Sequence, residues 1–430
     1  MKFYVLLVAF ISLSLLNNTS FAQNYTYHHT GDTSDITTTT IAGICLMGGA
    51  TENDEGSTWF LNRSGGGNIV VLRTSGSDGY NNYFYSQLGV IVQSVETIVF
   101  NNSAAANDPF VLRRIQQAEA IWLAGGDQYL YESYWKNTDV QNLLNDHIQV
   151  KKAPIGGTSA GMAILGDYYF SAENGTITST DAMNNPYDNK ITIGTDFIQA
   201  PFLVNTITDT HYDNPDRKGR HVTFLARMQE TDNSQDYFGI AADEYVAICI
   251  DENGIASVYG EYPTYDDNAF FLRTNCERTV PSVLTPSTPL TWQHSNGTVL
   301  SCNIKGVQNG TNRFDLVNFV ELDAADWSAW NVDAGNLQTS PIVFTPCTNN
   351  IPGVDPYPVR IYPNPSASVI YIEGTKDLKR IILTDLLGKE LKSVENSNEI
   401  NISEFENGNY YLKTEYYEMD FKLYKVTIIK

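Results

Sequence analysis

Basic residues are scarce in this chain of 430 residues, which contains 27 Lys and Arg against 49 Asp and Glu. The resulting net charge of −22 repels phosphate backbones, so we expect no nucleic acid partner. The same acidity would tolerate or attract a cationic substrate, and it also keeps an exported protein soluble.

Metal-binding and phosphate-binding patterns are also missing. The five cysteines form no CxxC pair and no Cys/His pair at metal-ligand spacing, and neither a GxxxxGK loop nor an EF-hand loop occurs. We therefore expect neither a metal ion nor another cofactor. Cys45 and Cys249 lie in apolar runs and are expected to pack as small hydrophobic residues. Cys276, Cys302 and Cys347 share one polar segment, in which any two could pair in an exported protein.

Long apolar runs are absent beyond the first 22 residues, so we predict no stable insertion into a membrane. Residues 1–22 combine Lys2, a short apolar stretch and the small-x-small sequence Ser20-Phe21-Ala22. This combination predicts a secretory signal peptide that is removed before Gln23. A membrane anchor is disfavoured because the apolar stretch is shorter than the roughly 18 residues of a spanning helix.

The rest of the chain divides into three regions and a linker. Residues 23–265 alternate apolar, β-branched runs with helix-like stretches, which predicts an α/β domain with a mostly parallel sheet covered by helices. Residues 266–350 are richer in Thr, Ser, Asn and Pro, and predict a β-rich appendage that either extends the first region or forms a separate module. Residues 351–357 form a Pro/Gly-rich linker, and the two-residue period of 358–430 predicts a small β-sandwich.

The C-terminal region carries several short motifs. They are YPNP at residues 362–365, DLLGK at 385–389, the pattern Phe405-x-x-Gly408-x-Tyr410-Tyr411 and a basic residue at the end of the chain. As a set they resemble the C-terminal sorting domain of the type IX secretion system of Bacteroidetes-like bacteria. The resemblance implies export through the type IX machinery, a secreted or cell-surface location, and removal of the domain afterwards.

One serine stands out for its glycine-rich surroundings. Gly157-Thr158-Ser159-Ala160-Gly161 follows a short apolar run and fits the pattern G-x-S-x-G. That pattern predicts a strained strand-to-helix turn, which exposes the Ser159 hydroxyl at the carboxyl end of a strand. The N–H groups at the start of the following helix point at the same space, so the N–H of Ala160 could stabilise an oxyanion.

A nucleophilic serine needs a base and an acid that orients the base. Among the six histidines, His211 and His221 are the candidates, and His211 is favoured because it lies between an apolar strand and a polar loop. Asp243 and Glu244 lie between two apolar runs, where a carboxylate can face a site at a strand start. The order serine, histidine, acid disfavours the α/β-hydrolase fold, in which the acid precedes the histidine.

Four motifs follow one another between residues 125 and 244. They are GGDQ at 125–128, GGTSAG at 156–161, Asp209-x-His211-Tyr212…Arg217-x-x-Arg220, and GIAADE at 239–244. Together they resemble the cyanophycinase/dipeptidase E family of serine peptidases. The resemblance implies a three-layer α/β fold similar to class I glutamine amidotransferase-like domains. It also implies Ser159 as the nucleophile, His211 as the base and Glu244 as the orienting acid.

The same resemblance implies further roles around this triad. Backbone N–H groups of Gly126 and Asp127, opposite Ala160, would bind the oxyanion. Four side chains would contact the substrate: Gln128, Asp209, Arg217 and Arg220. The histidine loop departs from the cyanophycinase pattern at three positions, which puts cyanophycin itself in question: Thr210, Tyr212 and Pro215.

These features together predict a secreted serine-type peptidase that forms an acyl-enzyme on Ser159. Its expected partner is a peptide or polymer with aspartyl linkages, either cyanophycin (multi-L-arginyl-poly-L-aspartate) or a related β-aspartyl or aspartyl peptide. Two alternatives stay open. One is a dipeptidase E-like exopeptidase that removes N-terminal Asp from short peptides, and the other is a secreted binding protein on the same scaffold without turnover.

Overall fold

The computed structural model describes most of the chain, namely residues 23–345, 360–362, 366–373, 378–385, 389–416, 422–428 and 430. The predicted signal peptide 1–22, the predicted linker 351–357 and Cys347 lie outside these ranges. Within the ranges, no helix is both long and apolar enough to cross a membrane.

The larger of two sheets in the N-terminal part has ten strands in the order β1-β4-β3-β5-β6-β2-β11-β12-β15-β16. In chain order they are β1 Tyr25–Gly31, β2 Ile44–Met47, β3 Asn68–Arg73, β4 Ser94–Phe100, β5 Ala120–Leu123, β6 Ile155–Thr158, β11 Ala247–Ile250, β12 Ile255–Tyr259, β15 Asn312–Asp315 and β16 Val320–Glu321. The strands from β4 to β2 in this order pair in parallel. The remaining pairs are antiparallel.

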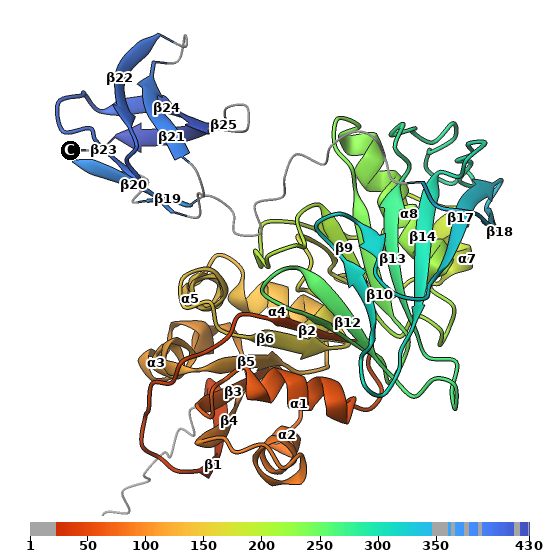
Figure 1. Cartoon of the computed structure of the whole chain (residues 1–430), viewed down its shortest axis with the longest axis horizontal. Helices are drawn as coiled ribbons and strands as arrows, with labels where there is room; N and C mark the ends of the chain where they lie inside the picture. The colour runs from red at the N-terminus through yellow and green to blue at the C-terminus, as the bar shows by residue number, and fades with distance from the viewer. Residues whose placement is uncertain are drawn as a thin grey trace, which may run out of the picture.

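Helices cover both faces of the parallel strands (Figure 1). They are α1 Asp54–Asn62 and α2 Gly79–Asn82 with η1 Tyr83–Gln87, and, against the opposite face, η2 Ser103–Asn107, α3 Pro109–Gln117, α4 Gln128–Trp135 and α5 Asp139–Gln149. Successive strand residues point to opposite faces. Leu46 and Leu72 therefore join the core under α3, α4 and α5, whereas Cys45 and Val71 join the core under α1.

A second sheet has eight strands in the order β18-β17-β14-β13-β10-β9-β7-β8. They are β7 Tyr168–Phe170, β8 Ile193–Gly194, β9 Thr206–Asp209, β10 Phe238–Ala242, β13 Asn268–Thr274, β14 Val299–Lys305, β17 Asp326–Asp333 and β18 Asn336–Pro341. Only β7, β9 and β10 pair in parallel. The helices α7 Ser179–Asn184 and α8 Lys218–Thr231 pack against its apolar residues.

The expectation of one mostly parallel sheet is confirmed only in part. The strands from β4 to β2 and the strands β7, β9 and β10 pair in parallel, but they belong to two mixed sheets. The hairpins β11–β12, β15–β16 and β17–β18 have short connections, which cannot carry the chain back for parallel pairing. The pairs β10–β13, β13–β14 and β14–β17 are also antiparallel, across longer connections. The strands of the predicted appendage hydrogen-bond into both sheets: β13, β14, β17 and β18 into the second, and β15 and β16 into the first.

The C-terminal region forms two small sheets, β19-β20-β23 and β22-β21-β24-β25. The strands are β19 Arg360–Tyr362, β20 Val369–Glu373, β21 Leu378–Thr384, β22 Glu390–Glu395, β23 Glu399–Asn401, β24 Gly408–Tyr416 and β25 Lys422–Ile428. Ile370 and Ile400 from the first sheet share one core with Ile381 and Leu412 from the second. This shared core makes the region a small β-rich unit.

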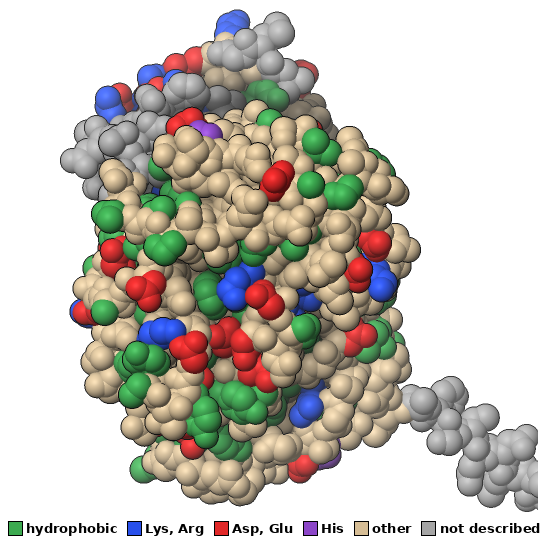
Figure 2. Space-filling view, turned by 90° about the vertical axis from the view of Figure 1, so that its right-hand side faces the viewer, with side chains coloured by type: hydrophobic (Ala, Val, Ile, Leu, Met, Phe, Trp, Pro, Cys, Tyr) green, Lys and Arg blue, Asp and Glu red, His purple; other side chains and the backbone are tan. Residues whose placement is uncertain are grey.

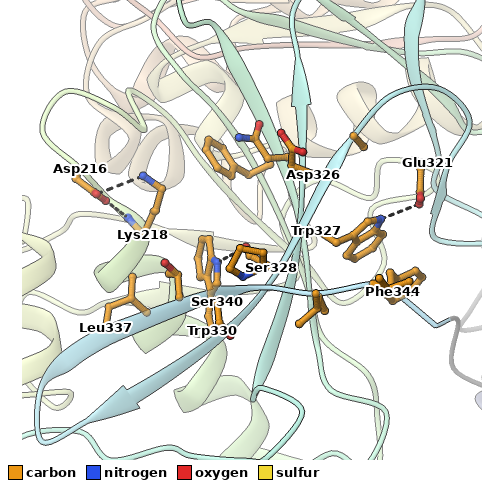
Figure 3. Close-up of a pocket in the computed structure, with 17 residues that line it drawn as sticks. Asp216, Lys218, Glu321, Asp326, Trp327, Ser328, Trp330, Leu337, Ser340 and Phe344 are labelled. Atoms are coloured by element: carbon orange, nitrogen blue, oxygen red, sulfur yellow. Dashed lines mark hydrogen bonds and ion pairs between the residues drawn. The ribbon is translucent and has the colours of Figure 1, made fainter.

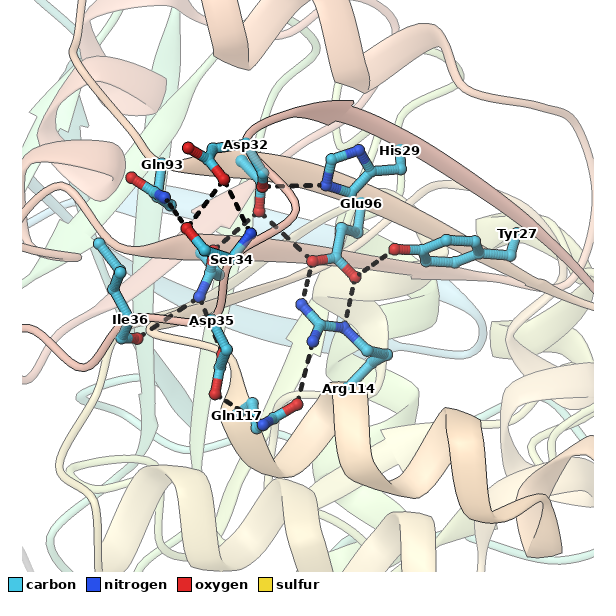
Figure 4. Close-up of polar contacts among 12 residues, drawn as sticks. Tyr27, His29, Asp32, Ser34, Asp35, Ile36, Gln93, Glu96, Arg114 and Gln117 are labelled. Carbon is cyan, nitrogen blue, oxygen red and sulfur yellow. Dashed lines mark hydrogen bonds and ion pairs between the residues drawn. The ribbon is translucent and has the colours of Figure 1, made fainter.

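A buried ion pair fastens the first described strand to the sheet edge (Figure 4). The carboxylate of Glu96 is fully buried on β4 and accepts two hydrogen bonds from Arg114 of α3. It also accepts a hydrogen bond from the Tyr27 hydroxyl of β1 at 2.9 Å. Burial of that hydroxyl, together with the Glu96 charge, raises the pKa of Tyr27. The pairing of β1 with β4 is thus supported by side chains as well as by backbone hydrogen bonds.

The described cysteines include both free thiols and a disulfide-bonded residue. Cys45 and Cys249 are buried opposite each other on β2 and β11, with their Sγ atoms 3.6 Å apart. Both are free thiols, as is the buried Cys302 on β14. Cys276 is disulfide-bonded.

Candidate active site

Ser159 lies directly after β6, where α6 Ala160–Ala163 begins. Its backbone has φ 51° and ψ −115°, an uncommon conformation for a residue with a side chain. A Cβ on Gly157 would lie 2.6 Å from the Gly161 carbonyl carbon, and a Cβ on Gly161 would lie 2.0 Å from the Leu123 carbonyl oxygen. Both glycines are therefore required by the tight turn, which presents the serine at the carboxyl edge of the parallel strands.

Three side chains form one hydrogen-bonded chain across the two sheets. Ser159 Oγ lies 2.8 Å from His211 Nε2, and His211 Nδ1 lies 2.6 Å from Glu244 Oε1. The remaining oxygen of Glu244 accepts a hydrogen bond from Asn214 at 3.3 Å. The hydrogen bond with His211 lowers the pKa of Glu244, so the carboxylate is ionised at neutral pH. An ionised Glu244 accepts the Nδ1 proton, which leaves Nε2 as the acceptor facing the serine.

Backbone hydrogen bonds to the end of β2 hold all three segments together. The N–H of Ser159 donates to the Met47 carbonyl at 3.0 Å, and the N–H of His211 donates to the Gly48 carbonyl at 2.8 Å. The residue after Glu244, Tyr245, donates its N–H to the Gly49 carbonyl at 3.1 Å. Sequence reasoning assigned no role to Gly48 and Gly49, although a strand that ends in two glycines signals close backbone approach.

Asp209 and Arg220, both expected to contact substrate, instead pair with each other in the interior. Each residue is 3% exposed, and Arg220 Nε donates to Asp209 Oδ2 at 2.9 Å. Burial alone would raise the pKa of Asp209, but the Arg220 guanidinium outweighs that effect and lowers it. Asp209 Oδ1 also accepts the Thr210 N–H at 2.8 Å, and Arg220 donates to Thr176 Oγ1 at 3.1 Å. The pair therefore fixes the end of β9, just before His211.

The substitution Arg220→Met should destabilise the protein by about 3–5 kcal/mol, because it leaves the Asp209 carboxylate buried without its partner. Arg313→Met is the matched control, since Arg313 pairs with Asp323 at the surface, where an ion pair contributes about 0–1 kcal/mol. Urea unfolding monitored by tryptophan fluorescence measures both. Equal stabilities of the two variants would contradict the assigned role of the buried pair.

Arg217 and Gln128 have side-chain hydrogen-bond donors with few or weak partners within the described part of the chain. Arg217 Nη1 lies 3.9 Å from Asp209 Oδ1, and its buried Nε has no hydrogen-bond partner among the described residues. Gln128 Nε2 donates to the Phe170 carbonyl at 3.4 Å. Gln128 begins α4, and its loop adjoins the serine, since a Cβ on Gly125 would lie 3.6 Å from Ser159 Cβ.

Gly126 and Asp127, the expected oxyanion donors, belong to that same loop between β5 and α4. Gly126 has φ 157°, and Asp127 caps α4 by accepting the N–H of Tyr129 at 3.0 Å. Ala160 begins α6 next to Ser159. The alternative base, His221, lies on α8 and is fully buried, and burial lowers its pKa to about 4.

Asp243, the other candidate acid, is 5% exposed and accepts a hydrogen bond from Asn268 at 2.9 Å. Burial raises its pKa to about 7.

Since an Asp in the unfolded chain titrates at about pH 4, the folded state holds the proton of Asp243 more tightly. The contribution of protonated Asp243 to the stability of the folded protein is complete below about pH 4 and is lost as the pH rises through about 7. Asparagine does not ionise, so Asp243→Asn should remove this loss of stability at high pH. The variant should be more stable than wild type at pH 8 by at most about 4 kcal/mol. Urea unfolding at pH 5 and pH 8 tests this, and an unchanged pH dependence in the variant would contradict it.

Two stretches of the chain match known families. Residues 74–258 match Peptidase family S51, and this stretch contains Ser159, His211 and Glu244. Residues 360–429 match the secretion system C-terminal sorting domain. The second match indicates export by type IX secretion to the cell surface or outside.

Curated relatives described as cyanophycinase resemble part of this chain. The one from Synechococcus elongatus is 24% identical over 225 residues, which are 50% of this chain and 65% of the relative. The one from Trichormus variabilis is 22% identical over 169 residues, which are 39% of this chain and 51% of the relative. The chain thus spans less than two thirds of the length of these relatives.

Two solved structures resemble it more distantly. A peptidase from an acI-B1 Actinobacterium is 14% identical with a TM-score of 0.38, over 52% of this chain and 89% of that one. A putative peptidase E protein from Listeria monocytogenes EGD-e is 15% identical with a TM-score of 0.34, over 51% of this chain and 99% of that one. The family matches therefore carry the comparison: residues 74–258 match Peptidase family S51, and residues 360–429 match the secretion system C-terminal sorting domain.

Proposed function

We propose that this protein is a serine-type peptidase that hydrolyses aspartyl peptides through an acyl-enzyme on Ser159. The observation that carries the proposal is the hydrogen-bonded chain from Ser159 Oγ to His211 Nε2, at 2.8 Å, and from His211 Nδ1 to Glu244, at 2.6 Å. A serine, a base within hydrogen-bond reach and an acid that holds the base are the parts that nucleophilic acyl transfer requires.

In the first step Ser159 Oγ attacks the carbonyl carbon of the scissile bond, while His211 Nε2 takes the hydroxyl proton. Glu244 stabilises the imidazolium that forms. The N–H groups of Gly126, Asp127 and Ala160 would bind the negatively charged oxygen of the intermediate, and one such donor commonly contributes about 3 kcal/mol.

The imidazolium then gives its proton to the leaving amine, which departs and leaves an ester on Ser159. A water molecule attacks this ester while His211 accepts its proton. Transfer of that proton back to Oγ releases the carboxylic acid product and restores the serine.

We assign recognition of the aspartyl carboxylate to Arg217 and Gln128 rather than to Arg220 or Asp209. A guanidinium can hold a carboxylate by two parallel hydrogen bonds, and Arg217 Nε has no partner among the described residues. Arg220 and Asp209 satisfy each other in the interior instead. This division places the proposed carboxylate contacts on two segments: Arg217 lies on the loop that carries His211, and Gln128 lies at the start of α4.

The relatives named cyanophycinase suggest the aspartyl polymer cyanophycin as one substrate. Thr210, Tyr212 and Pro215 differ from the cyanophycinase pattern, so a related aspartyl peptide is an equal candidate. We also propose that residues 1–22 direct export, that 23–350 form the enzyme and that 358–430 are the sorting domain.

A hydrolysis assay of the full chain on cyanophycin and on a panel of N-terminal aspartyl dipeptides tests the proposal. Release of β-aspartyl-arginine from cyanophycin supports a polymer hydrolase, whereas cleavage of the dipeptides alone supports an exopeptidase of the dipeptidase E type. Absence of hydrolysis on every substrate, with binding retained, would support the binding protein instead and overturn the proposal.

A further inference from the structure

An open groove of about 840 Å3 lies on the second sheet, between β17, β18 and the loop that begins α8 (Figure 3). Lys218 and Asp216 stand at one end of the groove, and Glu321 and Phe344 stand at the other. Most of its walls come from residues 299–344, which lie outside the stretch that matches the peptidase family. The proposed triad uses none of these walls.

The floor of the groove carries hydrogen-bond acceptors without partners. Phe270, Asn303 and Asp326 are directly opposite one another on β13, β14 and β17, so their side chains share one face of the sheet. Asn303 Oδ1 is buried without a hydrogen-bond partner among the described residues. The Asp326 carboxylate, exposed at the start of β17, makes no ion pair or side-chain hydrogen bond within the described part of the chain. Unpaired acceptors of this kind favour a ligand that brings donors.

The charge of the groove determines which kind of hydrogen-bond donor a ligand would bring. Its side chains include the carboxylates of Asp216, Glu321 and Asp326 and one ammonium group, that of Lys218. Lys218 already pairs with Asp216 at 3.3 Å, which leaves the other two carboxylates to set the charge of the groove. On the face shown in Figure 2, acidic side chains also gather near the middle, and the whole chain has a net charge of −22. A cation is therefore attracted.

The apolar part of the lining fits an aliphatic stem behind that cation. Trp327 stacks on Phe344 with ring centroids 3.7 Å apart, and Trp327 Nε1 donates to Glu321 at 2.8 Å. Long basic side chains bury their methylene stem against such surfaces while the charged end meets an acceptor. The lining thus matches a flexible side chain that ends in an ammonium or guanidinium group.

The groove lies beside the segment that carries His211. Tyr212, next to His211, packs on Phe270 with ring centroids 4.9 Å apart, and Phe270 lines the groove. Asp216 and Lys218 lie on the same loop, after His211. We propose that the groove is a subsite for a basic side chain of the peptide substrate, with Asp326 as its charge partner. This inference depends on the proposed peptidase function.

Binding of two peptides to the full-length Ser159→Ala variant tests the subsite without turnover. One is fluorescently labelled (Asp-Arg)3, and the other replaces each arginine with citrulline, a neutral isostere. We expect the citrulline peptide to bind at least tenfold more weakly in fluorescence anisotropy. Adding Asp326→Asn should weaken the arginine peptide five- to tenfold and leave the citrulline peptide unchanged. Asp333→Asn, at the exposed other end of β17, is the matched control and should change neither.

A second variant guards against an indirect effect of Asp326→Asn. Ser340→Arg places a guanidinium inside the groove and should weaken the arginine peptide by a similar factor. Equal binding of both peptides, or equal effects of Asp326→Asn and Asp333→Asn, would overturn the subsite. If wild type cleaves both peptides with the same KM, the subsite fails and the peptidase proposal stands. If Ser159→Ala binds as expected but wild type cleaves neither peptide, the peptidase proposal fails and the groove stands only as a binding site for a basic side chain.

Discussion

Ser159→Ala should lower kcat on the best substrate by about 10⁴- to 10⁶-fold, because it removes the atom that forms the acyl-enzyme. The effect should fall on kcat rather than on KM, since the proposed carboxylate contacts of Arg217 and Gln128 stay in place. His211→Ala should cost a similar factor, and the double variant should be no worse than either single variant. Residues that act as one unit show this lack of additivity.

Steady-state kinetics of the two single variants and the double variant measures this directly. The folded state is checked by thermal unfolding, which these substitutions should change little because the serine and histidine side chains are only partly buried. Additive losses in the double variant, or a Ser159→Ala variant with more than a tenth of wild-type kcat, would contradict the proposed nucleophile.

Gly49→Ala should reduce kcat/KM at least 100-fold although Gly49 carries no reactive group. A Cβ at this position would lie 2.4 Å from His211 Nε2, so the imidazole must move away from Ser159 or Glu244. Displacing a reacting group by about 1 Å commonly costs about 100-fold in rate. The absence of a side chain at Gly49 thus leaves the space in which the His211 imidazole lies between Ser159 and Glu244.

Gly89→Ala is the matched control for backbone strain. Gly89 has φ 70° and Gly49 has φ 117°, so both substitutions place alanine in an unfavourable conformation, but a Cβ on Gly89 meets no atom within 4 Å. Both variants should lose some stability in thermal unfolding, and only Gly49→Ala should lose activity. Similar activities of the two variants would show that the contact with His211 has no consequence for catalysis.

The turn around Ser159 and the positions of the strands before it in the chain could be predicted from sequence, because both depend on local patterns. Glycines at 157 and 161 mark a tight backbone, and apolar runs ending in glycine mark strands that end at one edge of a sheet. The interior pairing of Asp209 with Arg220 could not be predicted. A polar loop with two arginines has the same sequence pattern whether a guanidinium faces solvent or a buried carboxylate.

The second sheet was equally inaccessible to sequence reasoning. Its strands β7, β9 and β10 are short and lie far apart in the chain. β10 pairs with β13, and β14, β17 and β18 extend the sheet beyond β13, so half of the sheet comes from the region expected to be an appendage. The direction of pairing depends on contacts distant in sequence, which composition does not report. The role of Gly48 and Gly49 also depends on such contacts, since their partners are residues 211 and 245.

The most direct measurement is labelling of the full-length protein with a fluorophosphonate, followed by mass mapping of the labelled peptide. If Ser159 is the nucleophile that His211 activates, the wild-type protein will carry one adduct on Ser159. Ser159→Ala will carry none, and His211→Ala will label far more slowly. A wild-type protein that stays unlabelled, or an adduct on another residue that forms equally fast in both variants, would contradict this mechanism.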